Sequence, residues 1–156
     1  MGHRRSFVLF VVCCILFASC AANKNLKKAE KYLALGEYYD AASQYKQAYR
    51  KTSPKEREQR GKIALKIASC YAKINQTAAS LTAYRNAIRY KQASIEDHLT
   101  FGRLLLKNGE YKAAVEEFKL ALDSMPDNIL AKNGLVSAQN APEWKRIGSR
   151  YTVKTS

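Results

Sequence analysis

The sequence of 156 residues has little glycine, proline or cysteine, with 7 Gly, 3 Pro and 4 Cys. This scarcity excludes collagen, low-complexity disorder and disulfide-rich miniproteins. A chain of this length accommodates one ordinary domain, which excludes a multidomain enzyme, and 47% of apolar residues is enough for a hydrophobic core. Composition alone does not exclude a small enzyme, so that question depends on the sites.

Motifs for catalysis or metal binding are also lacking. The sequence has no glycine-rich phosphate loop, no nucleophile elbow and no cluster with metal-ligand spacing. For His98, packing or a surface position is the simplest role. The adjacent Glu116 and Glu117 would be about 100° apart on a helix, so their carboxylates cannot face one another. We therefore predict no enzymatic activity, no cofactor and no bound metal.

Acidic residues are scarce, because 13 Asp and Glu oppose 27 Lys and Arg and leave a formal net charge of +14. The imbalance is strongest between residues 44 and 91, where twelve basic residues are opposed only by Glu56 and Glu58. A surface of this charge attracts nucleic acid, anionic membranes or acidic proteins, although solubility alone also explains it. The N-terminal segment resembles an export signal, which argues against nucleic acid as the partner.

The N-terminal segment contains an uninterrupted apolar run from Phe7 to Phe17, preceded by two arginines. Its 11 residues are too few for a stable membrane-spanning helix, which needs about 20, but they suit the core of a secretory signal. The Phe-Ala-Ser-Cys sequence that ends at Cys20 resembles the bacterial lipoprotein signal. The resemblance implies a signal peptide at residues 1–19 and a lipid on Cys20. Two alternatives remain: cleavage near Ala21, which would give a soluble periplasmic or secreted protein, or retention of the run as a weak anchor.

Processing at Cys20 would leave Cys70 as the remaining thiol of the mature chain. A lipidated Cys20 cannot pair with it, so no internal disulfide is available. Because Cys70 falls in a helical segment, we expect it to be a small buried residue.

Three segments of the chain share one pattern. Each opens with a turn residue, has an aromatic residue nine positions later and an alanine three positions beyond the aromatic. The three sets are Gly36, Tyr45 and Ala48; Asn75, Tyr84 and Ala87; and Gly109, Phe118 and Ala121. The turn residues are 39 and 34 positions apart. A period of 34 with this pattern resembles the tetratricopeptide repeat, in which each unit is a helix–turn–helix.

The resemblance extends to the first helix of each unit, where a small residue is followed three positions later by a larger one. These pairs are Ala29 and Tyr32, Ala68 and Tyr71, and Gly102 and Leu105. The resemblance implies an all-α superhelix of three helix pairs plus a C-terminal capping helix, over residues 20–140. The repeats would lie at about 22–55, 61–94 and 95–128, with the capping helix at 128–140 and a tail or linker at 141–156. The longer first interval predicts an insertion at 55–60 that lengthens the following helix.

Helix ends are predicted from local chemistry. Ser53, Ser94 and the pair Asp127-Asn128 each suit the position that caps the start of a helix. Pro142 is expected to end the last helix. Trp144 then lies in the tail, where we expect it to fold back and pack on the repeats.

Longer runs point to a more specific family. KKAEKYLALGEYYDAASQYKQAYRK from Lys27, KIALKIASCYAKIN from Lys62 and AKNGLVSAQNAPEWKRIGSRYTV from Ala131 resemble the repeat region of OmpA-family outer-membrane lipoproteins of the Bacteroidota. Some of these belong to the type IX secretion machinery. The family's β-propeller and peptidoglycan-binding domain have no counterpart in this sequence, so peptidoglycan binding is not expected.

This resemblance implies a non-catalytic scaffold or adaptor. It would be anchored by lipid on Cys20 at the periplasmic face of the outer membrane and would bind other envelope proteins. One alternative is an adaptor for outer-membrane protein assembly. Another is an accessory subunit that binds an anionic glycan or lipid through its basic surface.

A partner-binding groove follows from the repeat register, because in the tetratricopeptide family the first helix of each pair lines the concave surface. The predicted groove residues are Leu65, Ser69, Lys73, Leu99, Arg103, Leu106 and Lys107. Leucines beside basic groups suit a peptide with apolar anchors and acidic flanks. The lysine and asparagine pattern by which some members hold a C-terminal carboxylate is not evident, since Leu26 and Glu30 occupy two matching positions.

The shared register places Ala48, Ala87 and Ala121 where paired helices approach closely. The variant Ala87→Leu should therefore overpack the interface and lower the free energy of unfolding by roughly 1–3 kcal/mol. Thermal unfolding checks this expectation, and an unchanged melting temperature would refute the assigned register.

Overall fold

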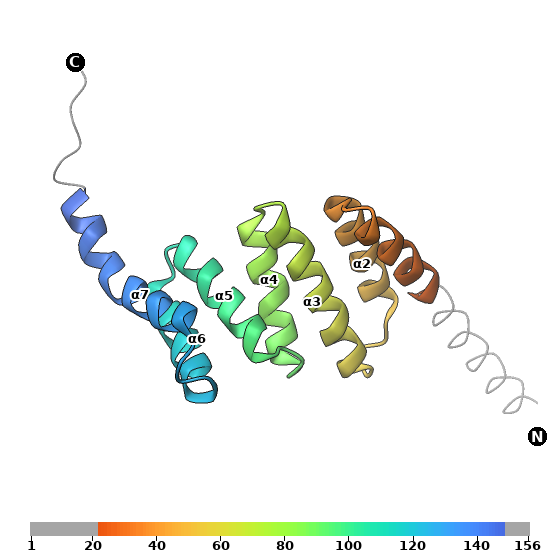
Figure 1. Ribbon diagram of the computed structural model, residues 1–156. Coiled ribbons are helices and arrows are strands. Elements are labelled where there is room, and N and C mark those ends of the chain that lie inside the picture. The colour runs from red at the N-terminus through yellow and green to blue at the C-terminus, as the bar shows by residue number, and fades with distance from the viewer. Residues whose placement is uncertain (1–21, 149–156) are drawn as a thin grey trace, which may run out of the picture. The chain divides into compact units, whose positions relative to one another are not determined.

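The computed structural model describes residues 22–148, with side chains as far as Trp144. Within this range every regular element is an α-helix, which confirms the all-α expectation. The elements are a helix at residues 22–34, α2 (Tyr38–Lys51), α3 (Arg57–Lys73), α4 (Thr77–Arg89), α5 (Ile95–Lys107), α6 (Tyr111–Ser124) and α7 (Ile129–Gly148) (Figure 1). Cys20 and the predicted signal peptide lie outside the described residues.

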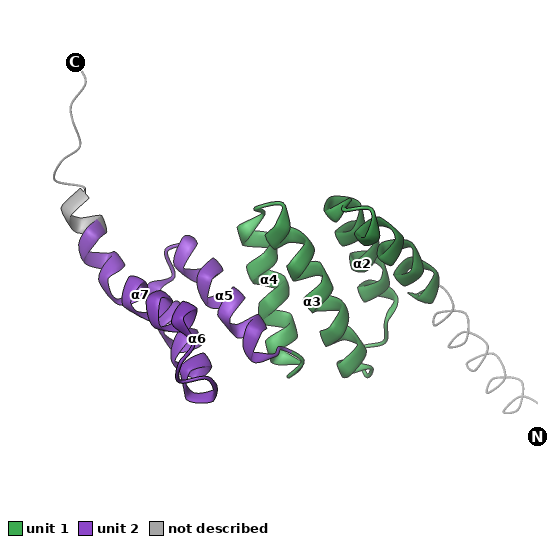
Figure 2. Cartoon of the chain, viewed as in Figure 1, with its two compact units in different colours: residues 1–92 green, residues 93–156 purple. Residues whose placement is uncertain are grey.

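The helices form two compact units that divide after Gln92 (Figure 2). In unit 1, which contains the helix at 22–34 and α2 to α4, α3 packs against both α2 and α4. In unit 2, which contains α5 to α7, α6 packs against both α5 and α7. Helices that are consecutive in the sequence thus pack as neighbours within each unit, as the repeat pattern predicts.

The turn inside each helix pair is built on a left-handed residue. Gly36, Asn75 and Gly109 have φ angles of 75°, 57° and 80°. At Gly36 the next amide, of Glu37, donates to the carbonyl of Tyr32 at 2.9 Å, and the equivalent bonds follow Asn75 and Gly109. This pattern satisfies the last carbonyls of the first helix and reverses the chain at once. The sequence prediction of a turn at these three positions is confirmed.

Small residues occupy the closest helix contacts. The second-helix alanines Ala48, Ala87 and Ala121 are all 0% exposed, as the register predicts. Large rings fill the space beside them, since Tyr45 and Phe118 are essentially inaccessible to solvent. Burial of these aromatic and aliphatic groups supplies the main favourable free energy of folding.

Two predicted helix starts are confirmed. The Ser94 hydroxyl accepts a hydrogen bond from the Asp97 amide at 3.2 Å, and the Asp97 carboxylate accepts from the Ser94 amide at 2.9 Å. The Asn128 side chain accepts from the Ala131 amide at 2.9 Å. The predicted lengthening of the helix after the insertion is confirmed as well, because α3 has 17 residues and α5 has 13.

The prediction that Ser53 caps α3 is wrong. The carbonyl of Ser53 accepts from the Glu56 amide at 3.0 Å, which makes a tight turn before the helix begins at Arg57. The Ser53 hydroxyl accepts from the Lys55 amide at 3.3 Å, inside that turn. A serine side chain satisfies a nearby amide in a turn as readily as at a helix start, and here the turn is adopted.

The prediction that Pro142 ends the last helix is also wrong, since α7 continues through it to Gly148. Proline has a φ angle suited to a helix and removes only one backbone donor, so a helix can pass through it at some cost. Trp144 consequently lies on the helix and not on a tail that folds back. Its side chain is 58% exposed, which contradicts the expected packing role.

Gly134 on α7 is required by the ring of Phe118 on α6. A Cβ atom at Gly134 would lie 2.5 Å from that ring, which is fully buried and has no space to move. We expect Gly134→Ala to destabilise unit 2 by about 1 kcal/mol or more, because overpacking outweighs the gain in helix propensity. Asn133→Ala, at the exposed neighbouring position, is the matched control and should be neutral or slightly stabilising. Chemical denaturation of the two variants compares them, and equal stability would contradict the close contact.

Candidate functional site

The predicted groove residues of unit 1 share one face of α3. Leu65, Ser69 and Lys73 are four residues apart, a spacing that aligns side chains along a helix. Leu65 is half-buried, whereas Ser69 and Lys73 are exposed. This stripe is therefore accessible to a partner and combines an apolar, a polar and a cationic side chain.

The predicted groove residues of unit 2 lie on α5. Leu99 is buried and Leu106 is half-buried, whereas Arg103 and Lys107 are exposed. Leu99 therefore serves the core more than a binding surface. The predicted groove takes residues from both units, and its continuity from α3 to α5 stays a prediction.

The acidic and histidine side chains singled out in the sequence have structural partners. His98 Nδ1 lies 2.6 Å from the Glu117 carboxylate, which links α5 to α6. Glu116 pairs instead with Lys119, at 3.3 Å. The two glutamates therefore point to different partners, as their spacing on the helix requires.

A cleft that the sequence analysis did not predict lies in unit 1, between α2, α3 and α4. It has a volume of about 310 Å³. The residues that line it are Lys46, Tyr49 and Arg50 of α2; Ala64, Ile67 and Tyr71 of α3; and Ala79, Thr82, Ala83 and Asn86 of α4. A smaller hollow of about 130 Å³ shares Lys46, Arg50 and Tyr71 with it and extends along α2.

Ala83 is the residue of the sequence that is most closely related to this cleft. In the repeat register, the position of Ala83 holds Gln44 in the first repeat and Glu117 in the third. The longer side chains occupy space that the methyl group of Ala83 leaves open. A small residue at this position leaves a cleft only because α2 and α4 both pack against α3. The sequence alone does not show that packing, so it did not reveal the cleft.

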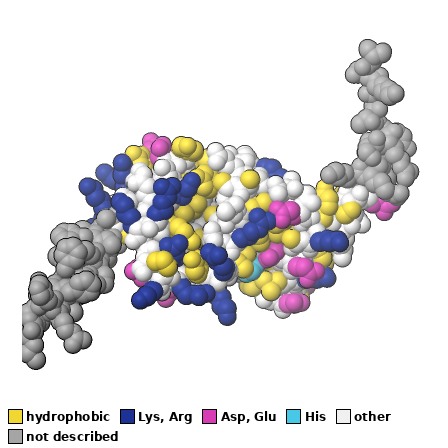
Figure 3. Space-filling model, turned by 180° about the vertical axis from the view of Figure 1, so that it is seen from behind, with side chains coloured by type: hydrophobic (Ala, Val, Ile, Leu, Met, Phe, Trp, Pro, Cys, Tyr) yellow, Lys and Arg dark blue, Asp and Glu magenta, His cyan; other side chains and the backbone are white. Residues whose placement is uncertain are grey.

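The cleft has an apolar floor and a basic edge. Its floor is formed by alanine and isoleucine side chains, and its charged lining residues are Lys46 and Arg50. The left part of Figure 3, where the molecule is seen from behind, shows hydrophobic surface bordered by lysine and arginine side chains. Such a combination binds a ligand with an apolar group and negative charge.

Arg60 fixes one wall of the cleft. Its guanidinium donates to the backbone carbonyls of Tyr49 and Thr52, at 3.1 and 2.8 Å, and lies 4.0 Å from the centre of the Tyr49 ring. Its Nε donates to the hydroxyl of Tyr90 at 3.2 Å. Arg60 thus ties the α2–α3 connection to the end of α4 and holds Tyr49, which lines the cleft.

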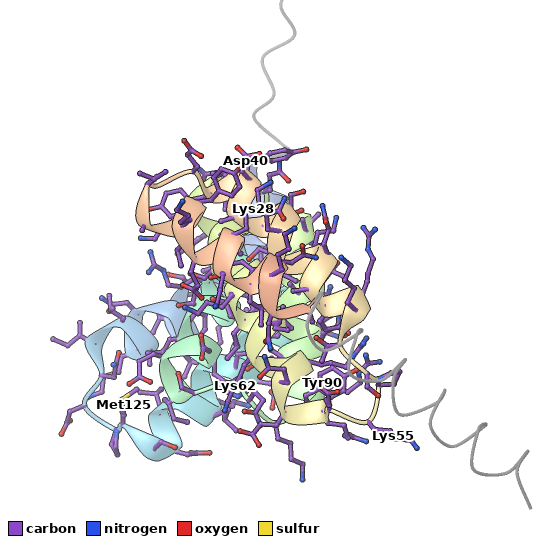
Figure 4. The ribbon with its side chains drawn as sticks, turned by 90° about the vertical axis from the view of Figure 1, so that its right-hand side faces the viewer. Lys28, Asp40, Lys55, Lys62, Tyr90 and Met125 are labelled. Atoms are coloured by element: carbon purple, nitrogen blue, oxygen red, sulfur yellow. The ribbon has the colours of Figure 1, made fainter. Side chains whose placement is uncertain are left out.

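Tyr90 lies at the end of unit 1 where α3 begins (Figure 4). A hydrogen bond from Tyr49 and another from Arg60 stabilise the phenolate of Tyr90 and lower its pKa to about 8. Tyr49 has the opposite tendency, because burial raises the pKa of its phenol. Arg57 and Arg89 also lie near the Tyr90 ring, at 5.7 and 5.2 Å from its centre.

Other reactive groups are not assembled into a site in the described part of the chain. Cys70 is buried, as expected, and burial raises the pKa of its thiol. Among residues 22–148, no three side chains of His, Cys, Asp or Glu come together as metal ligands. Within the same range, none of the helices has the length and apolar character that crossing a membrane requires.

The helix pairs, their left-handed turns and the buried small residues define the tetratricopeptide-repeat fold. A domain of the Plasmodium falciparum putative FK506-binding protein PFL2275c, its C-terminal TPR-containing domain, has the same fold, with a TM-score of 0.66 and 16% identity over 83% of this chain and 93% of that one. The second TPR domain of human RPAP3, solved in complex with the HSP70 peptide SGPTIEEVD, has a TM-score of 0.61 and 15% identity over 80% of this chain and 98% of that one.

In sequence, the chain is similar to DnaJ homolog subfamily C member 3 of Gallus gallus, with 28% identity over 138 residues. The match covers 85% of this chain but only 26% of the chicken protein. No known family model matches the sequence. These comparisons establish the tetratricopeptide-repeat fold.

The lowered pKa of Tyr90 predicts an ionisation near pH 8 that the unfolded chain, with an ordinary value of 10.0, does not have. Between these values the folded protein binds fewer protons than the unfolded one, so this group's contribution to stability rises with pH and is lost as the pH falls through about 8. Tyrosinate absorbance should show the transition. Tyr49→Phe should move it upward and Tyr90→Phe should abolish it, whereas Tyr39→Phe should leave it in place. A titration without a step near pH 8 would refute the arrangement.

Proposed function

We propose that this chain is a non-catalytic protein–protein interaction scaffold or adaptor that binds peptide segments on the first helices of its repeats. The observation that carries the proposal is the accessible stripe of Leu65, Ser69 and Lys73 along α3. An apolar anchor of the partner would contact Leu65, and an acidic flank would pair with Lys73. Arg103 and Lys107 on α5 would bind a further acidic segment.

Similar folds support peptide binding as the mode of action. The RPAP3 domain is described in complex with a peptide that contains two glutamates and ends in aspartate. Acidic peptides suit the basic groups of α3 and α5 here as well. Binding of a terminal carboxylate at the Glu30 position is disfavoured, since the Glu30 carboxylate already accepts from Tyr45 at 2.6 Å and lies 3.5 Å from Lys66. We therefore propose an internal acidic segment as the ligand.

We propose further that lipid on Cys20 anchors this scaffold at the periplasmic face of the outer membrane. The support is the apolar run followed by a small-residue sequence that ends at Cys20. The runs beginning at Lys27, Lys62 and Ala131 support a role in type IX secretion or a related envelope assembly. A soluble periplasmic or secreted protein is the alternative if cleavage occurs near Ala21.

The charge of unit 1 supports a second candidate function, the binding of an anionic glycan or lipid. Residues 22–92 contain 16 Lys and Arg against five Asp and Glu, whereas residues 93–148 contain seven against eight. Binding of this kind depends on many exposed charges, so it should weaken steeply with salt. A partner held by apolar anchors should resist moderate salt.

Affinity capture from crosslinked envelopes tests the scaffold. The double variant Arg103→Glu with Lys107→Glu should lose its partners while keeping its helicity by circular dichroism. Lys112→Glu with Lys119→Glu, two exposed lysines of α6, makes the same change in charge and should retain them. Cys20→Ala, which removes the lipid site, should lose partners that need the membrane anchor.

The outcomes separate the proposals. Equal capture by the α5 and α6 double variants would remove the α5 surface from consideration. Unchanged partners and unchanged membrane association of Cys20→Ala would refute the lipid anchor. If the chain captures an anionic glycan or lipid but no protein, and moderate salt abolishes this capture, then glycan or lipid binding would replace the scaffold as the proposed function.

A further inference from the structure

We propose that the cleft between α2, α3 and α4 is a second docking surface, and that its ligand is an acidic helical segment of a partner protein with one large apolar side chain. The apolar side chain would insert between Tyr49, Ala79 and Ala83, and two carboxylates would pair with Lys46 and Arg50. This surface is separate from the α3 stripe of the proposed function and does not depend on it.

The two surfaces lie on opposite sides of α3. The cleft residues Ala64, Ile67 and Tyr71 and the stripe residues Leu65 and Ser69 all belong to this helix. At about 100° per residue, the centres of the two sets are about 150° apart. A ligand in the cleft therefore contacts the second helices of the first two repeats, α2 and α4, and leaves the stripe free.

The cleft exists because the second repeat has small residues where the first repeat has longer ones. Ala79 and Ala83 occupy the positions held by Asp40 and Gln44 in the first repeat. The two alanines are one turn apart, so together they form a depression along α4. Its volume of about 310 Å³ accommodates a leucine or phenylalanine side chain and part of the ligand backbone.

Charge complementarity identifies the ligand as acidic. None of the residues that line the cleft is acidic, and among the side chains described, those of residues 22–144, no ion pair involves Lys46 or Arg50. The two cations are one helical turn apart on α2, so carboxylates one turn apart on a partner helix match them. Two charge pairs at the exposed edge of an apolar contact speed association and fix the orientation of the ligand.

The neighbouring polar groups favour a helical segment. Thr82 and Asn86, at the α4 edge, are one turn apart in the same way as Lys46 and Arg50 at the α2 edge. A helix lying between these edges would offer an acidic side chain to α2, a polar side chain to α4 and an apolar one to the floor. Arg60 is a positioning residue for this site, because it holds the Tyr49 wall without lining the cleft itself.

A designed peptide tests the proposal with the full-length chain. The probe is a labelled helical peptide with two glutamates one turn apart beside a photoreactive leucine, and a second probe has lysines in place of both glutamates. The glutamate probe should bind saturably by fluorescence anisotropy, whereas the lysine probe should not. After irradiation, mass spectrometry should locate the crosslink on residues of α2 or α4 that line the cleft.

Two variants and one control make the test specific. Lys46→Glu with Arg50→Glu should weaken binding of the glutamate probe by about tenfold or more. Ala83→Gln, which fills the cleft with the residue that the first repeat carries at this position, should weaken binding while preserving the fold. Lys27→Glu with Lys31→Glu has the same spacing and change in charge on exposed positions of the helix at 22–34 and should bind normally.

Three results would overturn the proposal. A crosslink on Leu65, Ser69 or Lys73 would assign the acidic peptide to the α3 stripe, which keeps the proposed function and removes the second surface. If the glutamate probe does not bind saturably, the cleft is not a peptide site. The proposed function would not be affected, because the capture experiment with the α5 double variant tests it separately. A dimer by light scattering that Ala83→Gln dissociates would identify a second copy of the chain, not a partner protein, as the occupant.

Discussion

The close approach of paired helices over small side chains is the constraint on which the rest of this structure depends. Ala48, Ala87 and Ala121 are completely buried, and a Cβ atom on Gly134 would lie 2.5 Å from the ring of Phe118. Helices this close have room for a large ring only where the facing helix carries a small residue, as Gly134 and Gly102 do opposite Phe118. The same spacing brings consecutive helices side by side and gives each helix a packed face and an exposed face.

The two candidate binding surfaces follow from how α3 is packed. Because α2 and α4 both contact α3, they leave its stripe of Leu65, Ser69 and Lys73 accessible on one side. On the other side they form the walls of the cleft, and the short side chain of Ala83 keeps that space open. α3 therefore contributes to two surfaces of similar chemistry, in which an apolar contact lies beside Lys73 in the stripe and beside Lys46 and Arg50 of α2 in the cleft. Partner choice would then depend on the spacing of acidic groups in the ligand.

Arg60 shows how the basic composition serves structure as well as binding. Its guanidinium satisfies the backbone carbonyl of Tyr49 in the last turn of α2 and that of Thr52 just after this helix. After the hydrogen bond from Tyr49, which has the larger effect, the hydrogen bond from Arg60 also stabilises the phenolate of Tyr90, and together they lower the pKa of this half-buried tyrosine to about 8. Lys46 and Arg50, in contrast, make no ion pair with the side chains of residues 22–144. Part of the positive charge thus holds the fold together, and part forms no ion pair among the described side chains.

The sequence by itself determined the features that depend on neighbours along the chain. The turns at Gly36, Asn75 and Gly109, and the helix starts at Ser94 and Asn128, involve hydrogen bonds across only a few residues. The alanine register was equally readable, because it repeats in every unit. These local rules are enough to predict an all-α fold of paired helices. The stripe on α3 was predicted from the resemblance to the tetratricopeptide repeat.

Only the tertiary structure decided the features that depend on which segments meet. Ser53 has the chemistry of a helix cap and of a turn residue, and the connection to α3 adopted the turn. Pro142 and Trp144 were misjudged because a helix can accommodate proline and no described surface buries the indole. The cleft needs Lys46 and Ala83, 37 positions apart, on two helices that both lie against α3. Sequence periodicity gives the face of each helix, but it does not give the space left between two of them.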